Sequence, residues 1–283
     1  MTPPRRKTVA FHVGAHKTGT SVVQGYLRDN ARRLRRHRMV YLHRTAMNGF
    51  VGWGEKLVED PAPLSRRIAL ILRIPWFTVV VASHENTLGK PFVDGVAGLY
   101  PRAAEIIPVL RRVLAPYRTK VFLSIRPQGE FIESYYLQLI HQGGHQPFSD
   151  WLAQIDLNAL SWRPIVDDLT AAFGREQVEI LDFRQVQRDQ QAYLQDFFRR
   201  IDPRLSVEIS PPPVRNPSIS DKGLRLALAA NPYLTSAAER RLMRVFLQDN
   251  FSNVDYPRPV LLNDDQKAQL LERYGAEYEA LVS

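Results

Sequence analysis

The sequence predicts an α/β protein with a central parallel sheet that is flanked by helices on both faces. Short, nearly continuous apolar segments rich in Val, Ile and Phe recur along the chain, and each ends at a turn signal. Such segments are typical of parallel strands that are buried on both faces. Segments with helical periodicity separate them, and this alternation implies right-handed crossovers in a three-layer arrangement.

The expected strands and helices alternate in order. The expected strands cover residues 8–13, 39–42, 78–82, 120–125 and 178–183. The expected helices between them cover residues 20–36, 102–114, 129–141 and 162–173. Four arginines recur at helical spacing in the first of these helices and predict one basic stripe along it: Arg28, Arg32, Arg35 and Arg36.

The last third of the chain is expected to be mostly helical. The expected helices cover residues 190–200, 220–230, 236–248 and 264–280. A proline-rich connector at residues 211–217 is stiff and excludes helix. We interpret it as a rigid loop inside one domain, residues 1–283, with a sheet core at 1–210 and a helical extension at 211–283.

Composition limits the classes of function. The chain has 283 residues, with 38 Lys and Arg against 29 Asp and Glu, and a formal net charge of +9. This balance favours an anionic partner, namely nucleic acid, anionic lipid or a phosphorylated small molecule. Cysteine is absent, which excludes disulfides, thiolate zinc sites, iron–sulfur clusters and a cysteine nucleophile.

No segment has the length of a membrane span. The longest apolar segment, residues 68–82, is interrupted by Arg73 and Pro75, and it is shorter than the roughly 18–20 apolar residues that a span needs. The basic N-terminus leads directly into the first expected strand, so we interpret it as part of the fold rather than as a signal peptide. The expected location is the cytoplasm.

The loop after the first strand has the composition of a phosphate-binding turn. Gly14 and Gly19 bracket it, and Lys17 lies inside it. Thr20 and Ser21 then open the next helix, where backbone N–H groups and the helix dipole favour an anion. A nucleoside-triphosphate P-loop has the order GxxxxGK[ST], whereas here Lys17 precedes the second glycine. The turn is therefore P-loop-like in form but does not match a Walker motif.

A second candidate anchor follows the strand at residues 120–125. That strand leads into Arg126, and Ser134 lies eight residues later in the next helix. Open α/β sheets bind ligands at the carboxyl ends of their strands. An arginine there offers a fork of donors to a phosphate, and a serine adds a hydroxyl. We expect both side chains to face the crevice that holds the lysine-bearing loop.

Two candidate general bases follow the strand at residues 78–82. His84 and Glu85 come at its carboxyl end, which in a parallel sheet is the edge that carries the loop. A carboxylate or an imidazole can act as a general base that takes the proton of a hydroxyl group. Successive side chains on a strand face opposite ways, so only one of the two is expected in the crevice. The ordinary pKa of histidine near neutrality favours His84 as such a base, and Glu85 is the alternative.

Together the two anchors resemble those of the PAPS-dependent sulfotransferase superfamily. HKTGTS at residues 16–21 is similar to its 5′-phosphosulfate loop, and Arg126 followed by Ser134-Tyr135-Tyr136 is similar to its 3′-phosphate motif. The resemblance covers roughly residues 7–200 in order and spacing. It implies transfer of a sulfuryl group from PAPS (3′-phosphoadenosine 5′-phosphosulfate), with adenosine 3′,5′-bisphosphate (PAP) as the product.

The resemblance also implies roles for individual residues. The residues expected to hold the 5′-phosphosulfate are His16, Lys17, Thr18, Gly19, Thr20 and Ser21. Arg126 and Ser134 would hold the 3′-phosphate, and Arg215 or Lys222 of a closing C-terminal segment would contact the same group. Lys17 with Ser21 would stabilise the leaving phosphate, while Glu85 or His84 takes the acceptor proton. Cytosolic members of the family carry a histidine at a similar position and carbohydrate-modifying members often use a glutamate, and we favour Glu85. No metal ion is expected.

Two other classes of function stay open at the level of sequence. One is an ATP- and Mg²⁺-dependent phosphotransferase with an unusual P-loop, which would need Glu85 or Asp182 as metal ligand. The other is a non-catalytic anion- or nucleic-acid-binding protein that uses the arginine stripe. For the sulfotransferase, the resemblance favours a carbohydrate hydroxyl over a lipid-linked sugar or a small alcohol, and specificity is expected in loops at residues 47–64 and 143–157. No specific nucleic-acid partner is expected, and the sequence leaves the oligomeric state open.

Overall fold

The computed structural model describes residues 7–43, 50–203, 209 and 218–283. The chain divides into two compact units. The first unit comprises residues 1–126, 161–212 and 277–283, and the second comprises residues 127–160 and 213–276. The sequence predicts one boundary, at residue 210, between a sheet core and a helical extension. In the structure, the second unit also contains the segment that directly follows Arg126. The assignment of the whole chain to one domain stays a prediction.

The first unit is built on a five-stranded sheet in which every neighbouring pair is parallel. The strands are β1 (Thr8–Gly14), β2 (Met39–Leu42), β3 (Val79–Ser83), β4 (Arg118–Ile125) and β5 (Val178–Asp182). Their order across the sheet is β2-β3-β1-β4-β5. The chain therefore first builds the sheet on one side of β1 and then continues on the other, and the loop after β1 lies at this switch point, where such sheets bind ligands. The predicted fold class is confirmed.

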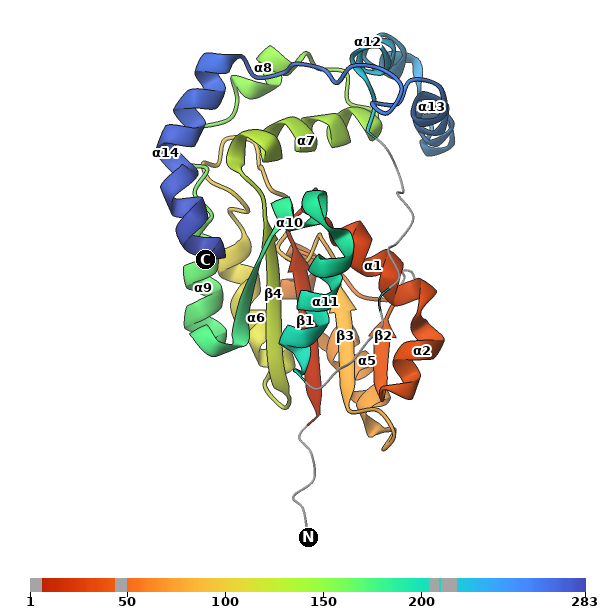
Figure 1. Ribbon diagram of the computed structural model, residues 1–283, viewed down its shortest axis with the longest axis vertical. Helices are drawn as coiled ribbons and strands as arrows, with labels where there is room; N and C mark the ends of the chain where they lie inside the picture. The colour runs from red at the N-terminus through yellow and green to blue at the C-terminus, as the bar shows by residue number, and fades with distance from the viewer. Residues whose placement is uncertain (1–6, 44–49, 204–208, 210–217) are drawn as a thin grey trace. The chain divides into compact units, whose positions relative to one another are not determined.

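Helices cover both faces of this sheet (Figure 1). One face carries α1 (Thr20–Asp29), α2 (Ala31–Arg36), α10 (Phe183–Arg188) and α11 (Gln190–Ile201). The other carries α5 (Ala62–Arg73), α6 (Ala103–Leu114) and α9 (Arg163–Phe173), with α4 (Glu55–Glu59) against α6 and the short η1 (Arg175–Gln177) before β5. Burial on both faces explains why the strand segments are apolar nearly throughout.

The second unit is helical in the described residues. Its elements are α7 (Gln128–His141), α8 (Phe148–Leu152), α12 (Asp221–Ala230), η2 (Asn231–Tyr233), α13 (Ala237–Asn250) and most of α14 (Asp264–Val282). Side chains join its two segments: Asn231 donates to the carbonyl oxygens of Ile140 at 2.8 Å and Gly144 at 2.6 Å, and the Glu133 carboxylate accepts from the Leu262 N–H at 3.1 Å. The predicted helical C-terminal third is confirmed.

The helix expected at residues 20–36 is two helices. The break lies at Asn30, which has φ −105° and ψ 16° and whose side-chain amide donates to the Tyr26 carbonyl oxygen at 3.0 Å. Asparagine competes with the helical hydrogen bonds in this way, and therefore it ends helices readily. Arg28 consequently lies in α1 and the other arginines in α2, so the prediction of one continuous basic stripe is wrong.

Helical segments also occur where the sequence predicts loops. α4 and the start of α5 lie within residues 47–64, and α8 lies within residues 143–157. For α5 the signal was present: Leu64, Ile68 and Leu72 are buried at intervals of four residues, and prolines occupy its first turn. In the part of the chain that the structure describes, no helix is long and apolar enough to cross a membrane.

Candidate functional site

The turn between β1 and α1 is held in a conformation that exposes its backbone. Gly14, Lys17 and Gly19 all have positive φ, at 105°, 58° and 84°. The Ala15 N–H donates to the Ser124 carbonyl oxygen of β4 at 3.0 Å, which anchors the turn to the sheet. A Cβ at Gly14 would lie 3.0 Å from the Cα of Glu85. Glycine is therefore required there for the turn to approach the segment after β3.

Successive N–H groups line the turn. Among the described residues, the first N–H of α1 that donates to a backbone carbonyl oxygen is that of Val22, to the Gly19 carbonyl oxygen at 2.8 Å, so the N–H groups of Thr20 and Ser21 precede the hydrogen bonds of the helix. Left-handed residues alternate with others along this stretch, a conformation that gathers N–H groups into an anion-binding concavity. The turn thus presents a row of donors at the positive end of α1.

The threonine hydroxyls shape the turn from inside. Thr18 and Thr20 are buried, and their Oγ1 atoms donate to the same Ala15 carbonyl oxygen at 2.7 and 3.1 Å. Ser21 is exposed at the start of α1. The two threonines therefore fix the curvature of the turn, whereas the Ser21 hydroxyl lies on its outer surface.

His16 is locked by hydrogen bonds. Its N–H donates to the Tyr100 hydroxyl oxygen at 2.7 Å, its Nδ1 lies 2.9 Å from the same oxygen, and its Nε2 lies 2.7 Å from the Asn86 Oδ1. One arrangement satisfies all three contacts: Tyr100 donates to Nδ1, and Nε2–H donates to Asn86. In this geometry the His16 ring holds the turn in place, because both of its nitrogens are used by the protein.

Lys17 and Arg126 bring two cations together at this turn. Arg126 Nη1 donates to the Lys17 carbonyl oxygen at 3.2 Å. Burial lowers the pKa of the Lys17 ammonium below its ordinary value, and the nearby positive charge of Arg126 lowers it further. Among the described residues, no carboxylate lies within 4 Å of the Lys17 Nζ. A bound anion would relieve the cost of keeping both groups charged.

Arg126 is held through both its side chain and its backbone. Its guanidinium lies over the Phe183 ring, 4.3 Å from the ring centre, and its carbonyl oxygen accepts a hydrogen bond from the buried Trp162 indole at 2.8 Å. A Cβ at Gly19 would lie 3.5 Å from the same Phe183 ring. The stack on Phe183 and the hydrogen bond to Lys17 fix the guanidinium beside the turn, because a planar guanidinium can stack on a ring and donate hydrogen bonds in its plane at the same time.

The two candidate bases in the segment after β3 lie in different surroundings. The Glu85 carboxylate is half-buried, and it accepts from the Gln24 side-chain amide of α1 at 3.2 Å. The His84 ring is 1% exposed and stacks on Trp53 with ring centres 4.1 Å apart. Its Nδ1 accepts from the Asn86 N–H at 3.2 Å, so the basic nitrogen of the neutral ring is already used. Geometry therefore favours Glu85.

A buried polar chain crosses three strands below the turn. His12 Nδ1 lies 3.0 Å from the Ser83 Oγ, its Nε2 lies 2.9 Å from the Ser124 Oγ, and that oxygen lies 3.0 Å from the Tyr193 hydroxyl. Burial lowers the pKa of His12 to about 4, with the Glu85 charge acting weakly in the other direction. A neutral His12 thus joins β3, β1 and β4 at the point where the turn is anchored.

The other predicted site residues lie in the second unit or outside the described residues. Ser134 is half-buried on α7, seven residues into that helix. Lys222 is exposed on α12, with its ammonium 5.1 Å from the ring centre of Tyr256. Arg215 lies outside the described residues. Lys17, Glu85, His84 and Arg126 are thus gathered in the first unit.

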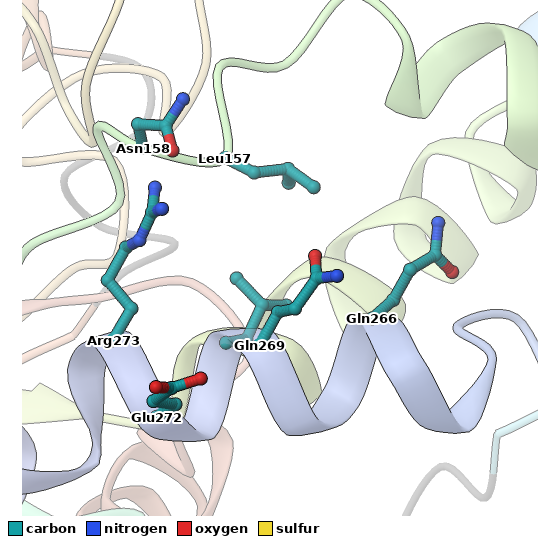
Figure 2. Close-up of a pocket in the computed structure, with 7 residues that line it drawn as sticks. Leu157, Asn158, Gln266, Gln269, Glu272 and Arg273 are labelled. Atoms are coloured by element: carbon teal, nitrogen blue, oxygen red, sulfur yellow. The ribbon is translucent and has the colours of Figure 1, made fainter.

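The second unit also contains a cavity of about 340 Å³. Figure 2 shows residues of α14 on one side of it and the loop after α8 on the other. Its lining is rich in amide groups and consists of Leu157, Asn158, Gln266, Gln269, Leu270, Glu272 and Arg273. None of the predicted site residues lines it. Within the described residues there is no group of three or more His, Asp or Glu side chains that could hold a metal ion.

Sequence reasoning missed the groups that hold the site in place. Tyr100 binds His16, Gln24 binds Glu85, and Trp162 binds Arg126. None of these residues belongs to a motif, and each lies at least 36 positions from its partner. Phe183 directly follows β5, and its ring lies under the Arg126 guanidinium.

Comparison with solved structures finds similarity to a structure titled "Crystal Structure of Sulfotransferase from Alicyclobacillus acidocaldarius". The two share 18% identity with a TM-score of 0.45, over 85% of this chain and 100% of that one. No protein-family model matches this sequence, and no curated protein sequence matches it. The proposal that follows rests on the residues of the site.

Proposed function

We propose that this protein is a PAPS-dependent sulfotransferase that moves a sulfuryl group from PAPS to a hydroxyl. The observation that carries the proposal is the position of Arg126, whose Nη1 lies 3.2 Å from the carbonyl oxygen of Lys17. A row of N–H donors and two cations thus occur at one turn of the backbone. This arrangement suits a ligand with two anionic groups joined by a short neutral part, as in an adenosine bisphosphate.

The turn would bind the 5′-phosphosulfate. The N–H groups from Lys17 to Ser21 would donate to its oxygens, and the Lys17 ammonium would add a full charge. Thr18 and Thr20 would act by fixing the turn, and His16 would act through its bonds to Tyr100 and Asn86. This refines the roles that the resemblance implies, because it assigns His16 to positioning rather than to direct contact.

Arg126 and Ser134 would hold the 3′-phosphate. The Arg126 guanidinium is pre-oriented by Phe183, so little conformational entropy is lost when it binds. Ser134 follows it on α7, and Arg215 or Lys222 would close over the same phosphate.

The reaction would proceed by in-line displacement. The acceptor oxygen forms a bond to sulfur while the bond from sulfur to the 5′-phosphate oxygen breaks. Glu85 takes the proton of the attacking hydroxyl, and the Lys17 ammonium with the N–H groups of the turn and the Ser21 hydroxyl stabilises the charge that develops on the departing phosphate. Gln24 orients the Glu85 carboxylate through the 3.2 Å hydrogen bond. Atoms and charge balance without a metal ion.

A nucleotide-binding comparison tests the assignment. A ligand that binds only the folded protein at about 100 times its Kd stabilises it by about 2.7 kcal/mol. We expect PAP to raise the melting temperature clearly and ATP with Mg²⁺ to raise it little. Arg126→Ala should reduce the effect of PAP, whereas Arg163→Ala, at an exposed arginine of the same unit, should not. A larger shift with ATP and Mg²⁺ would favour a phosphotransferase, and no shift with either nucleotide would favour a non-catalytic binding protein.

The acceptor we propose is a carbohydrate hydroxyl, and the proposed location is the cytoplasm. Transfer of label from PAPS to a panel of saccharides, lipid-linked sugars and small alcohols tests the first point. Transfer to none of the saccharides, with transfer to another class, would refute it. Fractionation of cells that express the tagged protein tests the second.

A further inference from the structure

The amino end of the sheet in the first unit carries a surface that the proposed reaction does not use. The candidate site lies where the strands end, whereas this surface lies where they begin. It includes Arg35 and Arg36 of α2, Arg73 at the end of α5, Arg118 at the start of β4, and the apolar Ile74 and Trp76 before β3. We name this set of six residues the amino-edge surface.

The segments that form this surface carry basic side chains and no acidic ones. Residues 30–43, 61–83 and 106–129 contain no Asp or Glu. Four arginines of the amino-edge surface are exposed, and Lys7 lies beside them, because its carbonyl oxygen accepts from the Arg118 N–H at 3.0 Å. These segments therefore contribute positive charge and no acidic side chain of their own to the surface.

Two large apolar side chains are exposed within this charged region. Trp76 is 57% exposed and Ile74 is 47% exposed, with Leu70 one turn earlier on α5 at 55%. Isolated exposed apolar residues are ordinary, but a group of them inside a basic region marks an interaction surface.

Trp76 is held in its exposed position by the surrounding backbone. Its indole N–H donates to the Arg35 carbonyl oxygen at 3.0 Å. Its own carbonyl oxygen accepts from Arg38 Nε at 2.9 Å, and the Arg38 guanidinium lies 5.6 Å from the ring centre. Arg38 has φ 61°, a left-handed conformation that costs a non-glycine residue free energy. The neighbouring turn at Arg38 thus holds Trp76 in an exposed position instead of letting it be buried.

We propose that the amino-edge surface docks the protein onto an anionic lipid bilayer. The arginines would contact lipid phosphates, and Trp76 and Ile74 would enter the interfacial region, where tryptophan is favoured. A basic surface also attracts nucleic acid. However, exposed aliphatic side chains such as Ile74 and Leu70 add nothing to contacts with phosphates, which dominate affinity for nucleic acid, whereas they stabilise insertion between lipids. The exposed apolar residues therefore favour the bilayer.

Vesicle binding tests the proposal with the full chain. The probes are vesicles of phosphatidylcholine alone and vesicles with about 30% phosphatidylglycerol, whose negative surface attracts basic segments. We expect binding to the second kind only. The double variant Arg35→Glu with Arg36→Glu lowers the net charge from +9 to +5, since 9 − 4 is 5. It should weaken binding by about thirtyfold or more, given the known contribution of each basic residue near an anionic surface.

The matched control changes charge equally at another place. Arg241→Glu with Arg244→Glu, at two exposed arginines of α13, also gives +5 and should bind like the unmodified protein. Equal loss of binding in both double variants would show a net-charge effect and would overturn the proposal. Absence of binding to the anionic vesicles would overturn it as well.

The apolar part of the surface has a separate test. Ile74→Ser removes an exposed side chain and leaves the hydrogen bond between Trp76 and Arg35 in place, so it should fold normally. It and Trp76→Ala should bind vesicles more weakly, most clearly in about 0.5 M salt, where charge attraction is screened. Unchanged binding by both variants would overturn the insertion of these residues. Tighter, salt-sensitive binding to duplex DNA or single-stranded RNA than to vesicles would assign the surface to nucleic acid instead.

Discussion

The most informative substitution is Gly19→Ala, at the residue that precedes α1. Gly19 has φ 84°, a conformation that costs alanine about 1–2 kcal/mol. Its Cβ would lie 2.9 Å from Cγ2 of Val186, a buried side chain of α10. Relief of such a contact in a packed region costs roughly another 1–2 kcal/mol. We therefore expect Gly19→Ala to lower the free energy of unfolding by roughly 2–4 kcal/mol.

The same substitution six residues later should have the opposite effect on the free energy of unfolding. Gly25 lies inside α1, and a Cβ there would meet nothing within 4 Å. Alanine is favoured over glycine in a helix interior by about 0.5–1 kcal/mol. Gly25→Ala should therefore stabilise the protein slightly and leave PAP affinity unchanged, whereas Gly19→Ala should also weaken PAP binding, because it shifts the N–H groups of the turn.

Thermal melting and calorimetric titration with PAP check both variants. A loss of 2–4 kcal/mol corresponds to a fall in melting temperature of roughly 3–7 °C for a chain of this size. In a Val186→Ala background, the penalty of Gly19→Ala should shrink by about 1 kcal/mol or more, since the contact with Cγ2 is gone. Equal shifts for the two glycine variants, or an unchanged penalty beside Ala at position 186, would refute the geometry of the turn.

Three further predictions concern titrating groups. The pKa of His12 is about 4 in the folded state and 6.5 in the unfolded state, so only the unfolded state binds a proton there as the pH falls from 6.5 to 4. The free energy of unfolding should therefore drop by roughly 3 kcal/mol over that range. In urea titrations, His12→Gln should show a weaker dependence of this free energy on pH. The lowered pKa of Lys17 means that PAP affinity should fall as the pH rises through that pKa, with proton uptake on binding in calorimetry; Lys17→Met should lack this dependence. Glu85→Gln should lower the transfer rate by about 10²–10⁴-fold and leave PAP affinity unchanged. His84→Gln changes a buried ring that stacks on Trp53, so it should chiefly lower the melting temperature. An equal loss of rate in both variants would show that Glu85 is not the base.

Local sequence signals were sufficient for the sheet and for the turn. The strands are short apolar segments buried on both faces, so composition alone marks them. The turn depends on Gly14, Lys17 and Gly19 within six residues of one another, and its positive φ values agree with glycine at two of the three positions. The order of these residues already separated the turn from a Walker motif.

Contacts between residues that are far apart in the chain cannot be predicted from one sequence. Tyr100 lies 84 positions from His16, and Gln24 lies 61 positions from Glu85, so nothing local indicates either pair. The break at Asn30 depends on a side-chain hydrogen bond to Tyr26, which competes with helical periodicity that otherwise continues through it. The second unit joins residues 127–160 to residues 213–276, a grouping that no compositional boundary reveals.

The choice of base could be narrowed only with coordinates. In sequence, His84 and Glu85 are neighbours at the end of one strand, and alternation says only that they face opposite ways. The structure adds that the His84 ring is buried against Trp53 and that the Glu85 carboxylate is bound to Gln24 of α1. Burial and partner, rather than ordinary pKa, therefore distinguish the two candidates.

A crystal structure of the protein with PAP tests the shared binding of one nucleotide most directly. We expect the 5′-phosphate on the N–H groups from Lys17 to Ser21 and the 3′-phosphate on the guanidinium of Arg126. A nucleotide whose phosphates contact neither Lys17 nor Arg126, or whose 5′-phosphate lies away from the start of α1, would contradict the proposed function.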